Sequence, residues 1–412
     1  MKEITGGVCA PKGFLAGGVR CGIKASAAKR DLALIYSEAP CTAAALFTAN
    51  KVKAASVLVS REHIAGGNLR AVIANSGNAN ACTGEAGLAA ARRMADLAAA
   101  NLSAAYNTLI RDEVAVASTG VIGVPFPVAA VESGMDALIA SLKHDAAGHD
   151  AALEAIMTTD TRKKDGAVEL AIGGKTVHIG GMTKGAGMIH PNMATMLCFI
   201  TTDAAISRDC LDAALRQSVR RSFNRLTVDG DTSTNDTIIV MANGLAGNPP
   251  ITAPGPEYDS FTAALETLCV KLTRAMARDG EGASRLVTVT VGGAQDEAVA
   301  ETLAKSVAAS SLVKAACFGA DANWGRVLCA LGYAGVDLDP DAVDVSFAGA
   351  AGDILVCRGG AAVPFSEEDA KRILTQEEIE IRINVGKGTG EAVVWGCDLT
   401  YGYVKINGDY RS

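Results

Sequence analysis

The chain has 412 residues, of which 49% are hydrophobic and 20% charged, and its formal net charge at pH 7 is −7. This length and composition are typical of a globular protein with one large domain or two domains. The acidic balance and an aromatic content of 4% argue against a nucleic-acid surface built from basic patches and stacking rings. A long uncharged segment, residues 114–131, contains two glycines and two prolines, so we expect no membrane span there.

The cysteine and histidine patterns predict neither a disulfide framework nor a metal site. Eleven cysteines occur without a C-x-x-C pair, and five histidines show no metal-binding spacing. Free thiols in a reducing compartment explain this usage. The N-terminal stretch MKEITGG lacks the apolar region of a signal peptide. We therefore expect a cytoplasmic protein that binds no nucleic acid, membrane or metal.

The first half of the chain is predicted to be rich in strands. Short apolar runs predict strands at residues 31–36, 43–47, 54–59, 69–74 and 114–117. Helices are predicted at residues 84–100, 129–142 and 151–157. Alternating residues at 168–172 and 176–179, separated by Gly173-Gly174, predict a hairpin. A polar loop at residues 75–84 suits a turn with left-handed positions, and ordinary turn chemistry is enough to explain it.

The second half alternates more regularly between strands and helices. An apolar run at residues 194–200 is typical of a buried strand. Helices are predicted at residues 208–221, 261–278 and 297–307, and strands at 238–242, 286–291, 343–347, 353–356, 380–384 and 391–395. Many short strands with interspersed helices indicate a layered α/β or α+β fold. The first half has too few helices between consecutive strands for parallel βαβ winding.

Ser118-Thr119-Gly120 follows the strand predicted at residues 114–117. A backbone N–H after a turn that glycine permits, beside a threonine hydroxyl, is the kind of donor pair that stabilises an oxyanion. The glycine-rich segment around Lys184 matches no nucleotide motif: Gly185 stands where a P-loop has Ser or Thr, and residues 185–190 read G-x-G-x-x-H. No G-x-S-x-G elbow of a serine hydrolase occurs.

Thr195 stands in the apolar run that follows a loop containing glycine and proline. An internal threonine is a poor nucleophile because nothing ionises its hydroxyl. If the Ala194–Thr195 bond were cut, the new α-amine, with a reference pKa of about 7.7–8.0, would serve as general base for the threonine Oγ. The same Oγ would make the cut by attacking the Ala194 carbonyl, with an N-to-O acyl shift and hydrolysis of the ester. The residues alone leave this chemistry open against a threonine that only begins a strand.

Seven segments together resemble the ornithine acetyltransferase family, also called glutamate N-acetyltransferase. They are KGAGMIHPNMATML at residues 184–197, APKGF at 10–14, NSGNANACTG at 75–84, MTTDT at 157–161, SFNRLTVDGDTSTNDT at 222–237, NWGR at 323–326 and YVKINGDYRS at 403–412. The resemblance covers the whole chain, and motifs of this length in this order are highly specific. These are self-cleaving enzymes of arginine biosynthesis.

The resemblance implies a fold and a domain organisation. The fold would be α/β (α+β), with two stacked β-sheets flanked by helices, similar to N-terminal-nucleophile enzymes. Cleavage at Ala194–Thr195 would give an alpha chain, residues 1–194, and a beta chain, residues 195–412. The two pieces would remain associated and pair again into an α2β2 heterotetramer.

The resemblance also implies roles for individual residues. Thr195 would be the nucleophile, and Thr119 with Gly120 the oxyanion hole. The implied substrate-binding residues are Thr161 (with Thr158 and Thr159 as neighbouring alternatives), Lys184, Thr195, Glu281, Asn407 and Ser412. Our hypotheses are that Lys184 and Asn407 hold the substrate α-carboxylate or help the oxyanion, and that Glu281 attracts the side-chain ammonium of ornithine.

The implied reaction moves an acetyl group from N2-acetylornithine to L-glutamate through acetyl-Thr195, by a ping-pong route without a cofactor. The sequence leaves open whether acetyl-CoA is also a donor, which would make the enzyme bifunctional. One alternative is a related self-processing aminopeptidase or amidohydrolase, in which water replaces glutamate. Another is an uncleaved binding protein in which Thr195 is scaffold.

Overall fold

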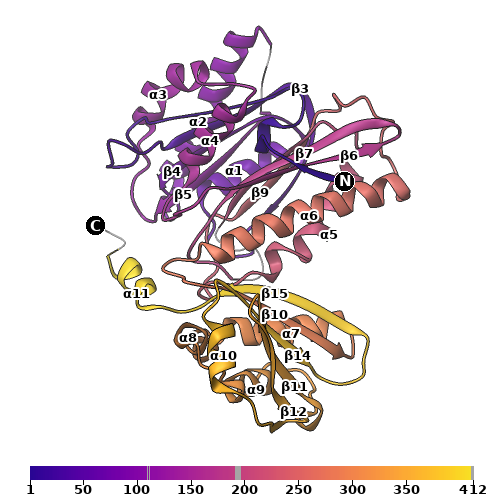
Figure 1. Ribbon diagram of the computed structural model, residues 1–412. Helices are drawn as coiled ribbons and strands as arrows, with labels where there is room; N and C mark the ends of the chain where they lie inside the picture. Colours follow the sequence, from indigo (N-terminus) through magenta and orange to yellow (C-terminus); the bar gives the residue numbers. More distant parts are fainter. Residues whose placement is uncertain (109, 111, 191–195, 410–412) are drawn as a thin grey trace. The chain divides into compact units, whose positions relative to one another are not determined.

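In the computed structural model, which describes residues 1–108, 110, 112–190 and 196–409, the chain is organised around two β-sheets (Figure 1). Each sheet belongs to its own unit. The first unit comprises Met1–Gly185, Asn192–Asn224 and Thr232–Leu272, and the second comprises Ala186–Pro191, Arg225–Asp231 and Thr273–Ser412. The two units are described separately below.

The sheet of the first unit has nine strands in the order β1-β6-β7-β8-β9-β3-β4-β5, with β2 paired to β3. The strands are β1 (Lys2–Ile4), β2 (Phe14–Val19), β3 (Leu32–Phe47), β4 (Asn68–Asn78), β5 (Val114–Val121), β6 (Lys164–Ile172), β7 (Lys175–Lys184), β8 (Leu197–Thr202) and β9 (Thr237–Ala242). Most neighbours are antiparallel, but β4 and β5 are parallel, as are β8 and β9. Each parallel pair is joined through a helix, α2 (Gly84–Tyr106) or α5 (Arg208–Arg220), because parallel strands need a crossover. The expectation of no parallel βαβ winding in the first half is therefore wrong for β4-α2-β5.

Strand β3 belongs to both halves of the nine-stranded sheet. Its first part pairs with β2 and β4, its last part pairs with β9, and the register on β4 shifts between Tyr36 and Cys41. An irregularity of this kind bends a strand and increases its twist. One hydrophobic core contains residues of β3, β4 and β5 together with residues of β7, β8 and β9, among them Val72 and Phe199. The two halves of the bent sheet are thus stacked layers with a shared core.

Three helices cover the other face of β3, β4 and β5. They are α1 (Ala55–His63), α2 and α3 (Val128–Ala140). The alanine-rich stripe of α2 lets this helix approach the strands closely. Helix α4 (Ala146–Ile156) adds to the core between the layers, and α6 (Pro256–Arg278) runs from the first unit into the second. The strand predicted at residues 54–59 is wrong, because these residues form α1; an apolar run of this length does not distinguish a strand from a helix.

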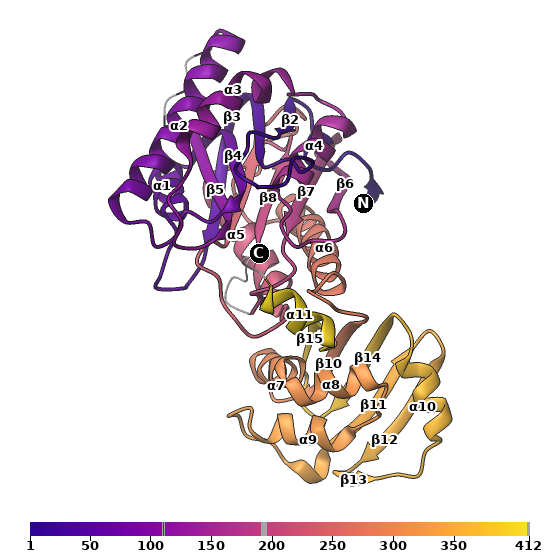
Figure 2. The same cartoon turned by 90° about the vertical axis from the view of Figure 1, so that its left-hand side faces the viewer.

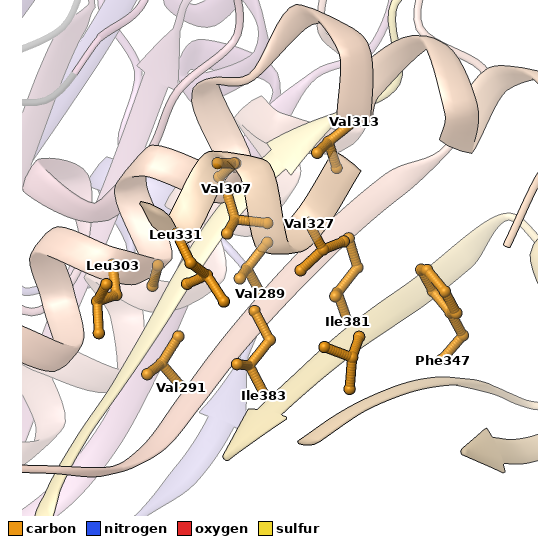
Figure 3. Close-up of a cluster of buried hydrophobic side chains, with 14 of the residues drawn as sticks. Val289, Val291, Leu303, Val307, Val313, Val327, Leu331, Phe347, Ile381 and Ile383 are labelled. Carbon is orange, nitrogen blue, oxygen red and sulfur yellow. The ribbon is translucent and has the colours of Figure 1, made fainter. Parts of the chain in front are cut away.

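The second unit contains a six-stranded sheet in the order β13-β12-β11-β14-β10-β15 (Figure 2). Its strands are β10 (Leu286–Ala294), β11 (Asp344–Gly349), β12 (Gly352–Arg358), β13 (Ala361–Ala362), β14 (Glu378–Asn384) and β15 (Gly390–Cys397). Its helices are α7 (Glu297–Ala309), α8 (Ser311–Gly319), α9 (Trp324–Gly332), α10 (Glu367–Leu374) and α11 (Tyr401–Gly408). Figure 3 shows side chains of the helices, such as Leu303 and Leu331, turned toward Val289 and Val291 of β10, in a core of aliphatic residues.

The predicted fold class is confirmed: the chain is mixed α/β, with two sheets flanked by helices. The sequence did not reveal α8, α9, α10 or α11. The predicted division into residues 1–194 and 195–412 concerns a covalent cut rather than a spatial boundary. Both residues of the predicted cleavage point lie outside the described residues, so the cut remains a prediction.

Candidate active site

Thr119 and Gly120 lie near the end of β5, beside the end of β4. Thr119 pairs with Ser76, and Gly120 pairs with Gly77. Gly120 has φ +136°, and a Cβ at this position would lie 2.3 Å from the carbonyl carbon of Gly77. Only glycine is compatible with this backbone and this close approach. The glycine of the S-T-G pattern is therefore required by the local packing of the parallel pair, whatever its chemical role.

Lys184 is the last residue of β7, in the opposite layer of the bent sheet. Its buried Nζ donates a hydrogen bond to Thr119 Oγ1 at 3.2 Å. The two residues are 65 positions apart in the sequence and are not on neighbouring strands. The stacking of the layers thus brings together two of the residues singled out from the sequence.

A carboxylate that the sequence analysis did not select lies beside this pair. Asp160, in the loop between α4 and β6, has a fully buried side chain. Its Oδ1 accepts hydrogen bonds from Lys164 Nζ at 2.5 Å and from the Gly185 N–H at 2.7 Å. Burial on its own would raise the pKa of Asp160, but the charges of Lys184 and Lys164 outweigh burial and hold this pKa well below its usual value. The carboxyl is therefore ionised.

The neighbouring Thr161 was predicted to bind substrate. It is exposed and directly follows Asp160, whereas Thr158 and Thr159 are half-buried. The main-chain N–H of Thr158 donates to Asp160 Oδ2 at 2.9 Å. The loop 157–161 is thus held by its own aspartate, and this arrangement leaves the choice among the three threonines open.

Two polar motifs from distant parts of the sequence meet next to Thr119. The side-chain amide of Asn235 donates to the carbonyl oxygens of Ala79 and Ser118, each at 2.7 Å. The motif around residues 75–84 is therefore tied to the motif around residues 222–237 directly beside β5. At this point the contact between the two motifs runs from the Asn235 side chain to backbone carbonyl groups.

Asp236, at the start of β9, is a second buried carboxyl in the first unit. Its Oδ1 accepts from the Met196 N–H at 3.0 Å. Burial raises the pKa of Asp236 well above its usual value, against the opposing effects of this hydrogen bond and the Lys184 charge. The two carboxyls near Lys184 therefore favour opposite protonation states.

A separate polar cluster in the second unit contains Glu281 and Asn407. The Asn407 side-chain amide donates to Glu281 Oε2 at 2.8 Å, and the Glu281 N–H donates to the Ala186 carbonyl at 2.8 Å. A Cβ on Gly187 would lie 2.3 Å from Glu281 Oε2, so a glycine is needed where this segment passes the carboxylate. The structure therefore brings together two of the predicted substrate-binding residues and part of the glycine-rich segment.

Asp229 holds the same segment from another side. Its carboxylate accepts from the N–H groups of Met188 and Ile189 at 2.6 and 2.8 Å, and from the Tyr403 hydroxyl at 3.2 Å. Met188 has φ +55°, a conformation that is uncommon for a residue with a side chain. Burial and the Asp229 charge raise the pKa of Tyr403. The last turn before residue 191 is thus held in place by a charged side chain.

The remaining predicted site residues, Ala194, Thr195 and Ser412, lie outside the described residues. Within the described part of the chain, no helix is long and apolar enough to cross a membrane. The same residues contain no group of three His, Cys, Asp or Glu side chains arranged to hold a metal ion.

The chain is an α/β protein of two units. In its first unit a buried lysine, Lys184, and the hydroxyl of Thr119 meet at strand ends, an arrangement that is typical of an enzyme site. A family model described as the ArgJ family matches residues 15–412. The chain belongs to the ArgJ family.

Relatives of similar length support this membership. The chain is 52% identical over 414 residues to the arginine biosynthesis bifunctional protein ArgJ of Symbiobacterium thermophilum, covering 100% of both proteins. It is 49% identical over 400 residues to the arginine biosynthesis bifunctional protein ArgJ 1 of Clostridium acetobutylicum, covering 97% of this chain and 96% of that protein.

Solved structures also match. The arginine biosynthesis bifunctional protein ArgJ of Bacillus halodurans is 44% identical and has a TM-score of 0.48, with coverage of 50% of this chain and 96% of that chain. The ornithine acetyltransferase of Mycobacterium tuberculosis, solved in complex with ornithine, is 42% identical and has a TM-score of 0.43, with coverage of 48% of this chain and 99% of that chain.

Proposed function

We propose that this ArgJ-family chain is an acetyltransferase of arginine biosynthesis, which transfers the acetyl group of N2-acetylornithine to L-glutamate. The observation that carries the proposal is the 3.2 Å contact between Lys184 Nζ and Thr119 Oγ1, in a chain with relatives named arginine biosynthesis bifunctional proteins. The Mycobacterium tuberculosis relative is an ornithine acetyltransferase that was solved with ornithine bound, which supports an ornithine-type substrate here.

The proposed reaction has two acyl transfers. Thr195 Oγ attacks the acetyl carbonyl of N2-acetylornithine, the α-amine of Thr195 takes the hydroxyl proton, and the C–N bond breaks to release ornithine with that proton. The α-amine of glutamate then attacks the acetyl ester, which gives N-acetylglutamate and restores the Thr195 hydroxyl. This scheme requires the prior cut between Ala194 and Thr195, which makes the α-amine.

Each remaining predicted residue has a role in this scheme. The Thr119 hydroxyl and the Gly120 N–H stabilise the oxyanion of both tetrahedral intermediates, at about 3–4 kcal/mol for each donor. Lys184 adds positive charge next to Thr119, which favours the same developing negative charge. Glu281 binds the side-chain ammonium of ornithine, and Asn407, which donates to Glu281, keeps that carboxylate in place. Thr161 and Ser412 complete the substrate contacts.

Other parts of the proposal follow from family membership. The word bifunctional in the names of the relatives supports a second activity, in which acetyl-CoA acetylates glutamate. The chain needs no other cofactor, works in the cytoplasm, and assembles as an α2β2 heterotetramer of the two pieces. The competing aminopeptidase or amidohydrolase differs only in its acceptor, which is water.

Thr195→Ala tests the mechanism, with Thr195→Ser as the matched control. We expect the alanine variant to remain one full-length band on denaturing electrophoresis and to lose acetyl transfer by about 10⁴-fold or more, as when an enzyme loses its nucleophile. The serine variant retains a hydroxyl and should still be cut. Full activity of an uncut wild-type chain would refute the mechanism.

The acceptor is tested with the unsubstituted protein. Incubation with N2-acetylornithine and glutamate should yield N-acetylglutamate and ornithine in equal amounts. Release of acetate in place of N-acetylglutamate would support the hydrolase. An assay with acetyl-CoA and glutamate alone decides the second activity.

A further inference from the structure

We propose that Asp160 is a positioning residue for acetyl transfer, which holds Lys184 and the Lys184–Gly185 peptide in place beside Thr119. This inference rests on the proposed function and assigns a role to a residue that the sequence motifs did not single out. Asp160 acts through Lys184 and through the main chain of Gly185. We assign it no contact with substrate.

The contacts of Asp160 converge on the end of β7. Its Oδ1 accepts from the Gly185 N–H at 2.7 Å, which is the peptide that follows Lys184. Its Oδ2 accepts from the Thr158 N–H at 2.9 Å, so the carboxylate is oriented by its own loop. A hydrogen bond from a main-chain N–H to a buried carboxylate is short and strong. Asp160 therefore holds the peptide at the end of β7 in place, and with it the main-chain position from which the Lys184 side chain extends.

Electrostatics link the same carboxylate to the Lys184 ammonium. The Lys184 charge is the main stabiliser of the ionised form of Asp160, ahead of the Lys164 charge. Because the attraction is mutual, the Asp160 charge also favours a positive charge on Lys184. A buried ammonium without such a carboxylate tends to lose its proton or to move.

The other charged groups near Lys184 do not replace Asp160. They are Lys164 at the start of β6, Lys24 in the loop before β3, and Asp236 at the start of β9. The pKa of Lys24 is lowered to about 8, chiefly by burial and in smaller part by the charges of Lys29 and Lys184, while the Asp31 and Asp160 charges oppose this shift. Burial favours the neutral form of Asp236. Asp160 thus acts on Lys164 and Lys184, whereas Lys24 is also under the influence of the buried Asp31.

A purely structural role for Asp160 would centre on its ion pair with Lys164, at 2.5 Å. Both side chains are buried, so replacement of Asp160 alone would leave a buried ammonium without its carboxylate and would destabilise the protein. The test therefore compares two variants that both lack the lysine: Lys164→Gln and Asp160→Asn/Lys164→Gln. They differ in the Asp160 charge and in one hydrogen-bond acceptor, because an amide keeps only one oxygen. The paired amides of the double variant can hydrogen-bond to each other.

The measurement is the pH dependence of kcat/KM for acetyl transfer from N2-acetylornithine to glutamate, between pH 6 and pH 10, per cleaved chain. Loss of the Asp160 charge favours the neutral form of Lys184. We therefore expect the alkaline limb of the double variant to lie about 1–3 pH units below that of Lys164→Gln. We expect kcat of the double variant to be about 10-fold lower or more, because the ammonium is no longer held beside Thr119. Coincident alkaline limbs would overturn the proposal.

Asp160→Glu provides a second test if the double variant does not fold. It keeps the charge but moves the carboxylate by one methylene, so kcat should fall by about 10-fold or more while the alkaline limb stays in place. A wild-type kcat for this variant would overturn the positioning role. Failure of the proposed function is distinguishable, because the unsubstituted protein would then not acetylate glutamate at all.

Discussion

The two units differ in where their buried charged side chains lie. In the first unit, Asp160, Lys164 and Lys184 gather at strand ends and contact one another or the backbone. In the second unit, the space between the sheet and its helices is filled by aliphatic side chains, while Glu281 lies in the loop between α6 and β10. Both units have aliphatic cores and both bury some charged side chains, such as Lys314 and Asp398 in the second unit. The difference is that the charged cluster of the first unit lies beside the hydroxyl of Thr119.

This difference has an energetic basis. A buried ion pair costs desolvation free energy that its own attraction only partly offsets, so it adds little net stability. An aliphatic core has no such cost. Truncations in the aliphatic core of the second unit should therefore act mainly on folding, whereas changes in the charged cluster of the first unit act on activity and, where they leave one buried charge unpaired, on folding as well. Both tryptophans, Trp324 and Trp395, belong to the second unit, so intrinsic fluorescence reports the unfolding of that unit.

The largest effect is expected for Leu303→Ala in α7. Leu303 is fully buried in the core of the second unit, and its truncation should lower the free energy of unfolding by about 3–5 kcal/mol. Denaturant unfolding followed by tryptophan fluorescence measures the loss. Leu312→Ala is the matched control, because Leu312 is 57% exposed and should change stability by no more than about 0.5 kcal/mol. Equal losses in the two variants would contradict the assignment of the core.

The next effect is on activity and concerns the first unit. Thr119→Val removes the hydroxyl at nearly constant shape, and we expect kcat to fall by about 10²–10³-fold, as for the loss of one oxyanion donor. The fluorescence transition of the second unit should stay in place. Thr119→Ser retains a hydroxyl and should restore most of the rate. An unchanged kcat in Thr119→Val would exclude Thr119 from the oxyanion hole.

The last prediction concerns how stability depends on pH through Asp236. Because the folded-state pKa of this carboxyl is raised, the unfolded chain, with a pKa of about 3.9, gives up the proton first. Stability therefore falls as pH rises from about 4 toward the folded-state pKa, by up to about 1.4 kcal/mol per pH unit. Asp236→Asn should remove this fall, so its stability relative to wild type should increase with pH.

Circular dichroism of denaturant unfolding between pH 4.5 and 7.5 measures this difference. Asp96→Asn replaces an exposed carboxyl of α2 and should leave the pH dependence unchanged. If the Asp236→Asn and wild-type curves run parallel, Asp236 is ionised in the folded protein, and the contrast with Asp160 is lost.

Local sequence patterns predicted much of the fold. The apolar runs at residues 69–74 and 114–117 lie within β4 and β5, and the helix predicted at residues 297–307 lies within α7. Residues 31–36 and 43–47 were predicted as separate strands because they form two separate apolar runs, yet β3 is continuous across the polar residues and Pro40 between them. Its proline lies in the part of the strand where the register shifts, which is a position that tolerates the missing N–H.

The features that the sequence analysis did not predict differ in how clear their sequence signals are. Helix α10 has clear signals, since Ser366 caps it and acidic residues fill its first turn. Asp160 gave no such signal. Its importance depends on the pairing of β6 with β7, which brings Gly185 to the loop 157–161, and on the stacking that brings Lys184 to Thr119. Neither contact can be predicted from a local sequence pattern, although the MTTDT segment, which includes Asp160, was part of the family resemblance.

The strand order of the first unit has a consequence for a chain that is cut between residues 194 and 195. Strands β8 and β9 follow the cut, but they lie between β7 and β3, which precede it. Six register pairs join β7 to β8, and six join β3 to β9. The two pieces of a cut chain would therefore be interleaved in a single sheet, and neither could leave without exposing open strand edges. Such a cut would alter the chemistry of one residue and leave the strand pairing in place.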